Sequence, residues 1–207
     1  MNQKGFLVSL KEYLHENKWF YLISLLFLFT GIVIGIYVIL YMGDTYKQDI
    51  SSYFLNFADQ FNSIDINKEK ILLGGLKSNL IMIGAIIILG IIIVGVPIIF
   101  IINIIKGFTI GFSTGVIINS MGLKGGLVIL ASIVPQNLLY VSAIIITSVF
   151  SCEMALNRLK SRLNKNSYGN KQCLSNYIPL CICIGVMLIL GAIIEAYFIP
   201  TILKYII

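Results

Sequence analysis

Long stretches without a single charged residue constrain this chain more than any other feature. No charge lies between Lys18 and Asp44, and the runs Ser78–Ile105 and Gly125–Cys152 are also charge-free. A hydrocarbon core about 30 Å thick needs about 20 apolar residues per helix, and each of these runs is long enough. Helices satisfy their backbone polar groups internally, as lipid requires. We therefore predict an all-α polytopic membrane protein.

Composition excludes the main alternatives. Charged residues make up 12% of the 207 residues and hydrophobic residues 58%, whereas a soluble domain carries about 25% charged residues. Disordered chains are poor in apolar residues, so disorder is excluded as well. The formal net charge of +6 then indicates topology and contact with anionic lipid, with no nucleic-acid partner.

We expect an N-terminal cytoplasmic amphipathic segment, residues 1–18, followed by a single transmembrane domain, residues 19–207, with five transmembrane helices. The expected spans are about residues 19–42, 78–105, 107–123, 125–152 and 174–203. Residues 43–77 form the expected outer loop, and residues 153–171 form the expected cytoplasmic loop. Basic residues near the N-terminus and in the second loop place both on the cytoplasmic side. An even number of spans must separate these two cytoplasmic segments. The short candidate span, residues 107–123, must therefore also cross the membrane. The N-terminus is then cytoplasmic and the C-terminus outside.

Two segments outside the spans have amphipathic patterns. Apolar residues at helical spacing before Lys18 predict an interfacial helix on the inner leaflet or a solvated lead-in to the first span. In the outer loop, Phe54, Phe57 and Phe61 continue one apolar stripe along a helix. Roughly 35 residues cannot bury a core alone. The stripe therefore covers lipid, the protein's own helices or a partner, and we take these three phenylalanines as candidate partner contacts.

Glycines recur at four-residue spacing. The series Gly107, Gly111 and Gly115 is uninterrupted, and Gly31 and Gly35 repeat the pattern in the first span. Glycines at this spacing let two membrane helices approach backbone to backbone. We predict tight helix packing there, within the chain in preference to between chains, although a homo-oligomer stays open.

Polar residues interrupt two of the apolar runs. Pro135, Gln136 and Asn137 fall inside residues 125–152, a run that would be about 42 Å long as one helix. Proline removes a helix hydrogen bond, so we expect a break near residue 135. Neighbouring helices seal it, or it lines a cavity or a partner groove. Glu195 in the last span is either a buried polar group or an anchor at the membrane interface.

The sequence carries no convincing catalytic or metal site. Gly111–Gly115 matches the nucleophile pattern G-x-S-x-G, but the sole histidine, His15, lies in the cytoplasmic segment. Cys181 and Cys183 are two residues apart and point to different sides of a helix, so they cannot share one metal. We expect no catalytic residue, no metal and no cofactor.

Several short motifs follow one another in a recognisable order. They are Lys106-Gly107-Phe108, Gly122-Leu123-Lys124-Gly125, Pro135-Gln136-Asn137 and Ile194-Glu195-Ala196-Tyr197. This order resembles the stage II sporulation protein M family of integral membrane proteins. The resemblance implies a noncatalytic scaffold at the septal and engulfing membrane during endospore formation. Its partners would be two peptidoglycan-degrading enzymes, stage II sporulation proteins P and D. The alternative function is a transporter or channel subunit of the cell envelope, which the broken helix and the acid at Glu195 favour.

Overall fold

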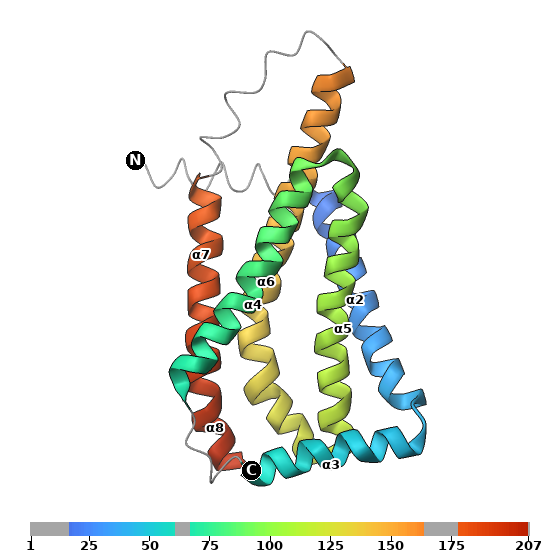
Figure 1. Cartoon of the computed structure of the whole chain (residues 1–207), viewed down its shortest axis with the longest axis vertical. Helices are drawn as coiled ribbons and strands as arrows, with labels where there is room; N and C mark the ends of the chain where they lie inside the picture. The colour runs from blue at the N-terminus through green and yellow to red at the C-terminus, as the bar shows by residue number, and fades with distance from the viewer. Residues whose placement is uncertain (1–16, 61–66, 164–177, 207) are drawn as a thin grey trace.

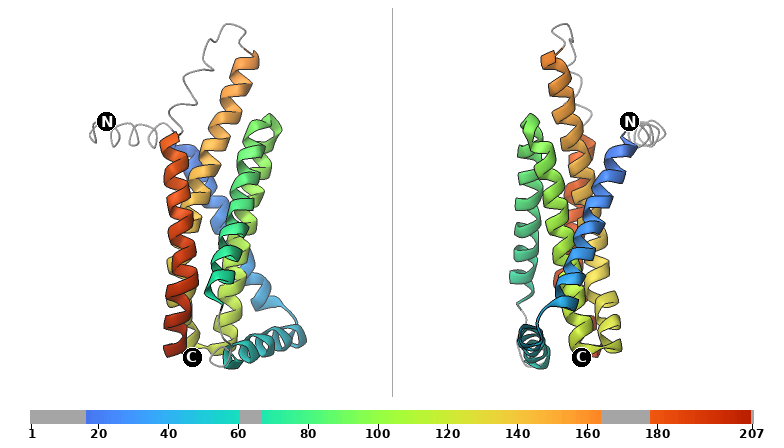
Figure 2. Two further views of the ribbon diagram at one scale, coloured as in Figure 1. Left: turned by 60° about the vertical axis from the view of Figure 1, so that its left-hand side comes forward. Right: turned by 90° about the vertical axis from the view of Figure 1, so that its right-hand side faces the viewer.

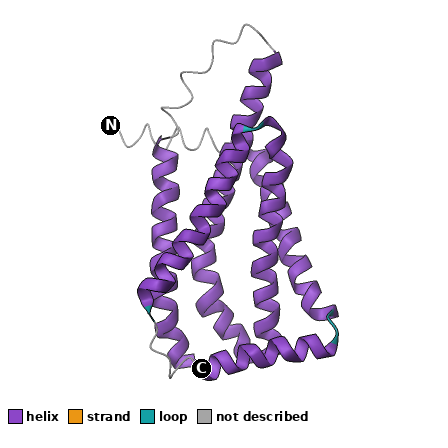
Figure 3. Cartoon of the chain, viewed as in Figure 1, coloured by secondary structure: helices purple, strands orange, loops and turns teal. Residues whose placement is uncertain are grey.

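The computed structural model describes residues 17–60, 67–163 and 178–206, and within them every regular element is helical (Figures 1 and 3). The elements are α2 (Lys18–Tyr41), α3 (Asp44–Gln60), α4 (Lys68–Ile91), η1 (Ile93–Gly95), α5 (Val96–Met121), α6 (Leu123–Leu163), α7 (Ile178–Ile193), η3 (Ile194–Phe198) and α8 (Ile199–Ile206). In these ranges 5 helices are long and apolar enough to cross a membrane. The predicted all-α polytopic fold is confirmed.

The chain runs up and down through a bundle, as Figures 1 and 2 show. α2 runs from one end of the bundle to the other, where α3 lies across the bundle. α4 then returns, α5 and α6 follow in opposite directions, and the continuous rod of α7, η3 and α8 ends beside α3. The start of α2 and the end of α6 therefore share one end of the bundle, and α3 lies at the other. That the end bearing Lys18 faces the cytoplasm stays a prediction from the basic residues.

The boundaries of the second and third spans differ from those expected. α4 ends at Ile91 and α5 begins at Val96, so residues 78–105 are not one span and residues 107–123 are not a separate crossing. Lys106 lies in the middle of α5 and does not separate two helices. The expectation was wrong because charged residues were taken as the span limits, and the turn between α4 and α5 contains none.

That turn is specified by backbone geometry. Ile92 N–H donates to Leu89 O at 3.0 Å, and Gly95 N–H donates to Ile92 O at 2.8 Å. A Cβ atom on Gly95 would lie 2.0 Å from Leu89 O, so no larger residue fits. Pro97 occupies the first turn of α5, where its missing N–H has no intrahelical partner to lose. Four apolar residues thus reverse the chain.

The polar loops are shorter than expected. The Asn67 side chain accepts a hydrogen bond from Lys70 N–H at 3.0 Å, a cap that starts α4 at Lys68, so the outer loop does not extend to residue 77. At the other end, α6 continues as helix to Leu163, through the first half of the loop expected at 153–171. Arg158 Nη1 in this extension donates to Ile91 O at 3.3 Å and so caps the end of α4.

Pro135 does not break α6, which is one helix of 41 residues with the proline inside it. Side-chain donors bond to carbonyl groups of the turns around the proline. Ser132 Oγ donates to Val128 O at 2.6 Å and Asn137 Nδ2 donates to Ile133 O at 2.9 Å. Neither carbonyl is the one that Pro135 leaves without a donor, which is Ala131 O, four residues back. Packing of α6 against α4, α5 and α7 lets the helix tolerate the proline. The predicted break near residue 135 is therefore wrong.

The core joins four of the spans. Its largest cluster contains residues of α4, α5, α6 and α7: Ile83, Ile86, Ile99, Tyr140, Ala143, Ile144, Cys152, Ile184 and Leu188. Many large apolar side chains, among them Leu26, Ile81 and Leu130, are instead exposed on the outside of the bundle. Lipid replaces water as their solvent, so this exposure agrees with a membrane protein.

Candidate functional site

The glycine series lies where α2 and α5 meet. A Cβ atom on Gly107 would lie 2.1 Å from Leu28 O, and one on Gly111 would lie 2.1 Å from Ile32 O. From the other side, a Cβ on Gly31 would lie 2.1 Å from Ile104 O. Gly115 faces the Ile39 side chain, to which a Cβ would be 3.2 Å distant. The two backbones are in contact within one chain, which fixes α5 as a rigid wall of the bundle.

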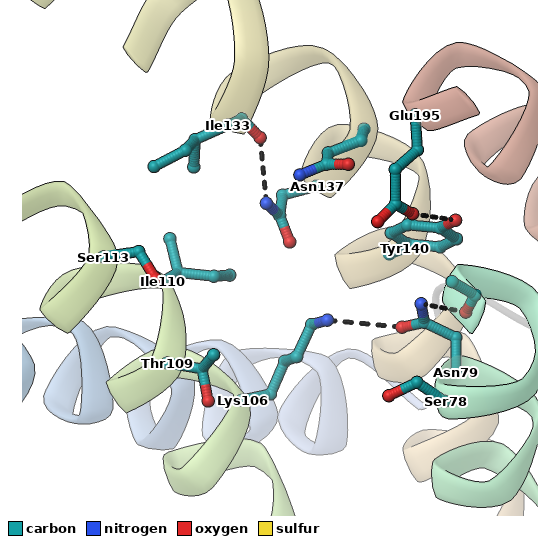
Figure 4. Close-up of a pocket in the computed structure, with 12 residues that line it drawn as sticks. Ser78, Asn79, Lys106, Thr109, Ile110, Ser113, Ile133, Asn137, Tyr140 and Glu195 are labelled. Carbon is teal, nitrogen blue, oxygen red and sulfur yellow. Dashed lines mark hydrogen bonds between the residues drawn. The ribbon is translucent and has the colours of Figure 1, made fainter. Parts of the chain in front are cut away.

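A polar cavity of about 210 Å³ lies between α4, α5, α6 and η3. Figure 4 shows its polar side chains pointing inward from all four elements. They are Ser78 and Asn79 from α4, Lys106, Thr109 and Ser113 from α5, Gln136, Asn137 and Tyr140 from α6, and Glu195 from η3. Their elements all belong to helices that are long and apolar enough to cross a membrane, so we expect the cavity at membrane depth.

Lys106 is the cation of the cavity. Its Nζ donates to Asn79 Oδ1 at 3.2 Å and lies 5.5 Å from the centroid of the Tyr140 ring. Asn79 is itself held by a bond from its Nδ2 to Gly75 O at 2.9 Å. The ammonium group of Lys106 on α5 therefore points toward α4, as Figure 4 shows.

Glu195 is the anion of the cavity. Its Oε2 accepts a hydrogen bond from the Tyr140 hydroxyl at 2.8 Å. The carboxylate also rests against Gly75, where a Cβ atom would lie 2.3 Å from Oε2. Because Gly75 has no side chain, the carboxylate of Glu195 can lie against the backbone of α4. Glu195 is hydrogen-bonded and half-buried, which fits either interpretation, a buried hydrogen-bonding group or an anchor at the membrane interface.

A π-helical turn carries Glu195. In η3, the N–H of Ile199 donates to Ile194 O, five residues back. Pro200 follows at once and has no N–H, so the ordinary bonding pattern could not continue through it. A π turn widens the helix by one residue and is common at functional sites. Here it rotates Glu195 to the side of the rod that faces α6.

The structure brings together part of the predicted site. Gln136, Asn137 and Glu195 line one cavity, while Pro135 lies beside it in α6. The glycine series lies on another contact of the bundle. Asn79, Lys106 and Tyr140 also line the cavity but were not predicted as site residues. Their signal was present, because each is a polar residue within an apolar run, but Lys106 was taken as the border of a span.

The structure describes only part of the phenylalanine stripe. Phe54 packs against a cluster of Ile117, Val128 and Ile133 on α5 and α6, so its side chain covers the protein's own helices. The side chain of Phe57 and all of Phe61 lie outside the described residues.

The outer face of α3 forms a second candidate surface. Tyr46 is 70% exposed and Tyr53 is 79% exposed, and their seven-residue spacing puts both on the same side of the helix. Besides the Phe54 contact, a hydrogen bond from Asn119 Nδ2 to Ser51 Oγ at 2.9 Å fixes α3 to α5. We call Tyr46 and Tyr53 the α3 face.

The cavity offers little for catalysis or metal binding. Within the described residues, no group of three His, Cys, Asp or Glu side chains could hold a metal ion. Ser113 lines the cavity with Lys106, yet the lysine donates to Asn79 and not to the serine. A serine without a base is a weak nucleophile. The arrangement is suited to holding charged and polar groups.

Fold and cavity together define a polytopic helical membrane protein with a polar, charge-balanced cavity within its bundle. The sequence places it more narrowly. The family model described as stage II sporulation protein M matches residues 24–200, and the chain belongs to this family. No curated protein and no solved structure matches the chain. The resemblance drawn from the motifs is confirmed, and the chain is a sporulation-related, multi-pass membrane protein of a family that is not a known enzyme family.

Proposed function

We propose that this protein is a noncatalytic membrane scaffold for peptidoglycan-degrading enzymes during forespore engulfment. Its proposed partners are stage II sporulation proteins P and D, at the septal and engulfing membrane. Family membership supports the setting.

The observation that carries the proposal is the placement of α3. This helix lies across one end of the bundle (Figure 2), held to α5 by Phe54 and by the bond between Asn119 and Ser51. It presents Tyr46 and Tyr53 away from the bundle. In the predicted topology this is the wall side of the membrane. Tyrosine is enriched at interfaces because it supplies a large contact area and a hydroxyl group on a stiff side chain.

The test replaces both tyrosines of the α3 face. Tyr46→Ala with Tyr53→Ala should reduce co-purification of the two hydrolases with the tagged protein from sporulating membranes at least tenfold, since buried interface tyrosines are often hot spots. The matched control is Tyr37→Ala, which removes an exposed tyrosine from the membrane-spanning part of α2. Unchanged recruitment by the double variant, at normal protein level, would exclude the α3 face as the docking surface.

The cavity favours a second candidate function, a transporter or channel subunit. Lys106 and Glu195 lie inside the membrane region with room for a solute between the helices, and intramembrane charges often mark solute pathways. Solute flux in proteoliposomes that Glu195→Gln abolishes would support transport. Hydrolase recruitment without any flux would support the scaffold alone.

A further inference from the structure

The two charged residues of the cavity, Lys106 and Glu195, each form a hydrogen bond with a neutral side chain. Lys106 Nζ carries three N–H donors and gives one to Asn79. Glu195 accepts one bond from Tyr140 at Oε2 and keeps acceptor positions on both oxygens. Both groups thus retain hydrogen-bonding capacity, which is costly to leave unused at membrane depth.

Two amides between these charges have spare acceptors. Gln136 Oε1 is fully buried and has no hydrogen-bond partner. The Asn137 amide nitrogen is used by Ile133 O, which leaves its side-chain oxygen for another donor. Figure 4 shows Asn137 and Lys106 entering the space from opposite walls. An occupant of the cavity would therefore meet a cation, an anion and the amide oxygen of Asn137 at once.

Size and access limit what that occupant can be. The volume is about 210 Å³, equivalent to about seven water molecules at about 30 Å³ each. Pockets for drug-sized ligands measure about 300–1,000 Å³, so a helix or a large ligand is excluded. Ser78 and Thr109 are exposed at the rim between α4 and α5 and give the entrance two hydroxyl groups.

We propose that the cavity binds a small zwitterion of amino-acid size, with its carboxylate on Lys106 Nζ and its ammonium group on Glu195. A simple anion would satisfy Lys106 and leave Glu195 unmatched, and a simple cation would do the reverse. A ligand that carries both charges satisfies both groups and keeps the cavity neutral, as burial in lipid demands.

The test uses three ligands of nearly equal size on the full-length protein in lipid nanodiscs. The probe is L-alanine, and the controls are L-lactate, which has no ammonium group, and L-alaninamide, which has no carboxylate. Calorimetry should show L-alanine binding at least about tenfold more tightly than either control, since a hydrogen bond to a charged group contributes at least that factor. Equal binding of the three ligands, or no heat with millimolar L-alanine, would overturn the proposal.

Variants assign the two charges. Lys106→Gln should abolish the preference for L-alanine over L-alaninamide, and Glu195→Gln the preference over L-lactate. Lys124→Gln and Glu69→Gln remove charges from helix ends outside the cavity, so they serve as matched controls with unchanged affinity. If Lys106→Gln and Glu195→Gln kept the wild-type preferences among the three ligands, the assignment of the carboxylate to Lys106 and of the ammonium group to Glu195 would be refuted.

One further variant keeps every charge in place. In Gly75→Ala the new methyl group would lie 2.3 Å from Glu195 Oε2, and the carboxylate at the end of a flexible side chain can move away. The fold should persist while L-alanine affinity falls at least about tenfold. Unchanged affinity would contradict the role of Glu195. These measurements need no hydrolase, so their failure leaves the proposed scaffold function untouched.

Discussion

The substitution Gly111→Ala tests whether direct backbone contact holds α2 against α5. The new Cβ would lie 2.1 Å from Ile32 O, whereas ordinary contact begins at 3.4 Å, so the helices must separate by roughly 1.3 Å. A gap near 1 Å forfeits about half of the dispersion energy of each pair. The obstacle is a backbone carbonyl, which cannot rotate away as a side chain can.

The expected loss follows from the length of that contact. Close atom pairs contribute about 0.1–0.2 kcal/mol each, so losing about half of this energy at about ten to twenty pairs costs about 0.5–2 kcal/mol. This agrees with the cost of about 1–3 kcal/mol for overpacking a core. We expect Gly111→Ala to lower the free energy of unfolding by that amount. The measurement is an SDS titration in mixed micelles, followed through the emission of Trp19 at the start of α2.

The matched control is Gly185→Ala in α7, where an added Cβ meets nothing within 4 Å. Alanine is favoured over glycine in a helix by about 0.5–1 kcal/mol, so this variant should be neutral or slightly more stable. If both variants unfolded at the same SDS concentration, the argument from backbone contact would be refuted.

Three further predictions follow from other contacts. Tyr140→Phe removes the hydroxyl that donates to Glu195, and unfolding in SDS should show a loss of about 1–3 kcal/mol that is absent when Glu195→Leu, which has no acceptor, is already present. Arg158→Gln removes the cap on Ile91 O; because Arg158 is exposed, the same titration should show a loss of at most about 1 kcal/mol. With the 4 native cysteines replaced by alanine, a cysteine introduced by Tyr53→Cys should react with an impermeant maleimide in intact protoplasts, and one introduced by Lys160→Cys only after lysis. The reverse labelling would invert the predicted topology.

Hydropathy predicted the class of fold and the number of crossings but not where two of the helices end. The limits failed at residues 92–95, because that turn is apolar and is specified by the N–H bonds of Ile92 and Gly95, which hydropathy does not register. They failed again at Lys106, since a lysine inside a helix and a lysine at its border look alike in sequence. Only the neighbouring Asn79 explains why this lysine is tolerated.

Periodicity identified contacts better than it identified surfaces. The four-residue spacing of Gly107 and Gly111 is a property of one helix, so it could be read from the sequence, whereas the partner α2 could not. The stripe on α3 was visible in the same way, but the contact of Phe54 with α5 and α6 depends on how α3 lies across the bundle. The convergence of Gln136 and Glu195 depends on the π turn of η3, which no short-range pattern announces.

The pairing of α2 with α5 bears on how the chain assembles during synthesis. The two helices run in the same direction, side by side, and the whole α3–α4 segment separates them along the chain (Figure 1). When α2 leaves the ribosome, the surface that its glycines require has not yet been made. The first helix must therefore wait in the bilayer, with Gly31 and Gly35 facing lipid, until the third crossing is inserted. A chaperone that binds newly inserted transmembrane helices would therefore act on this protein at that stage, before its cavity has formed.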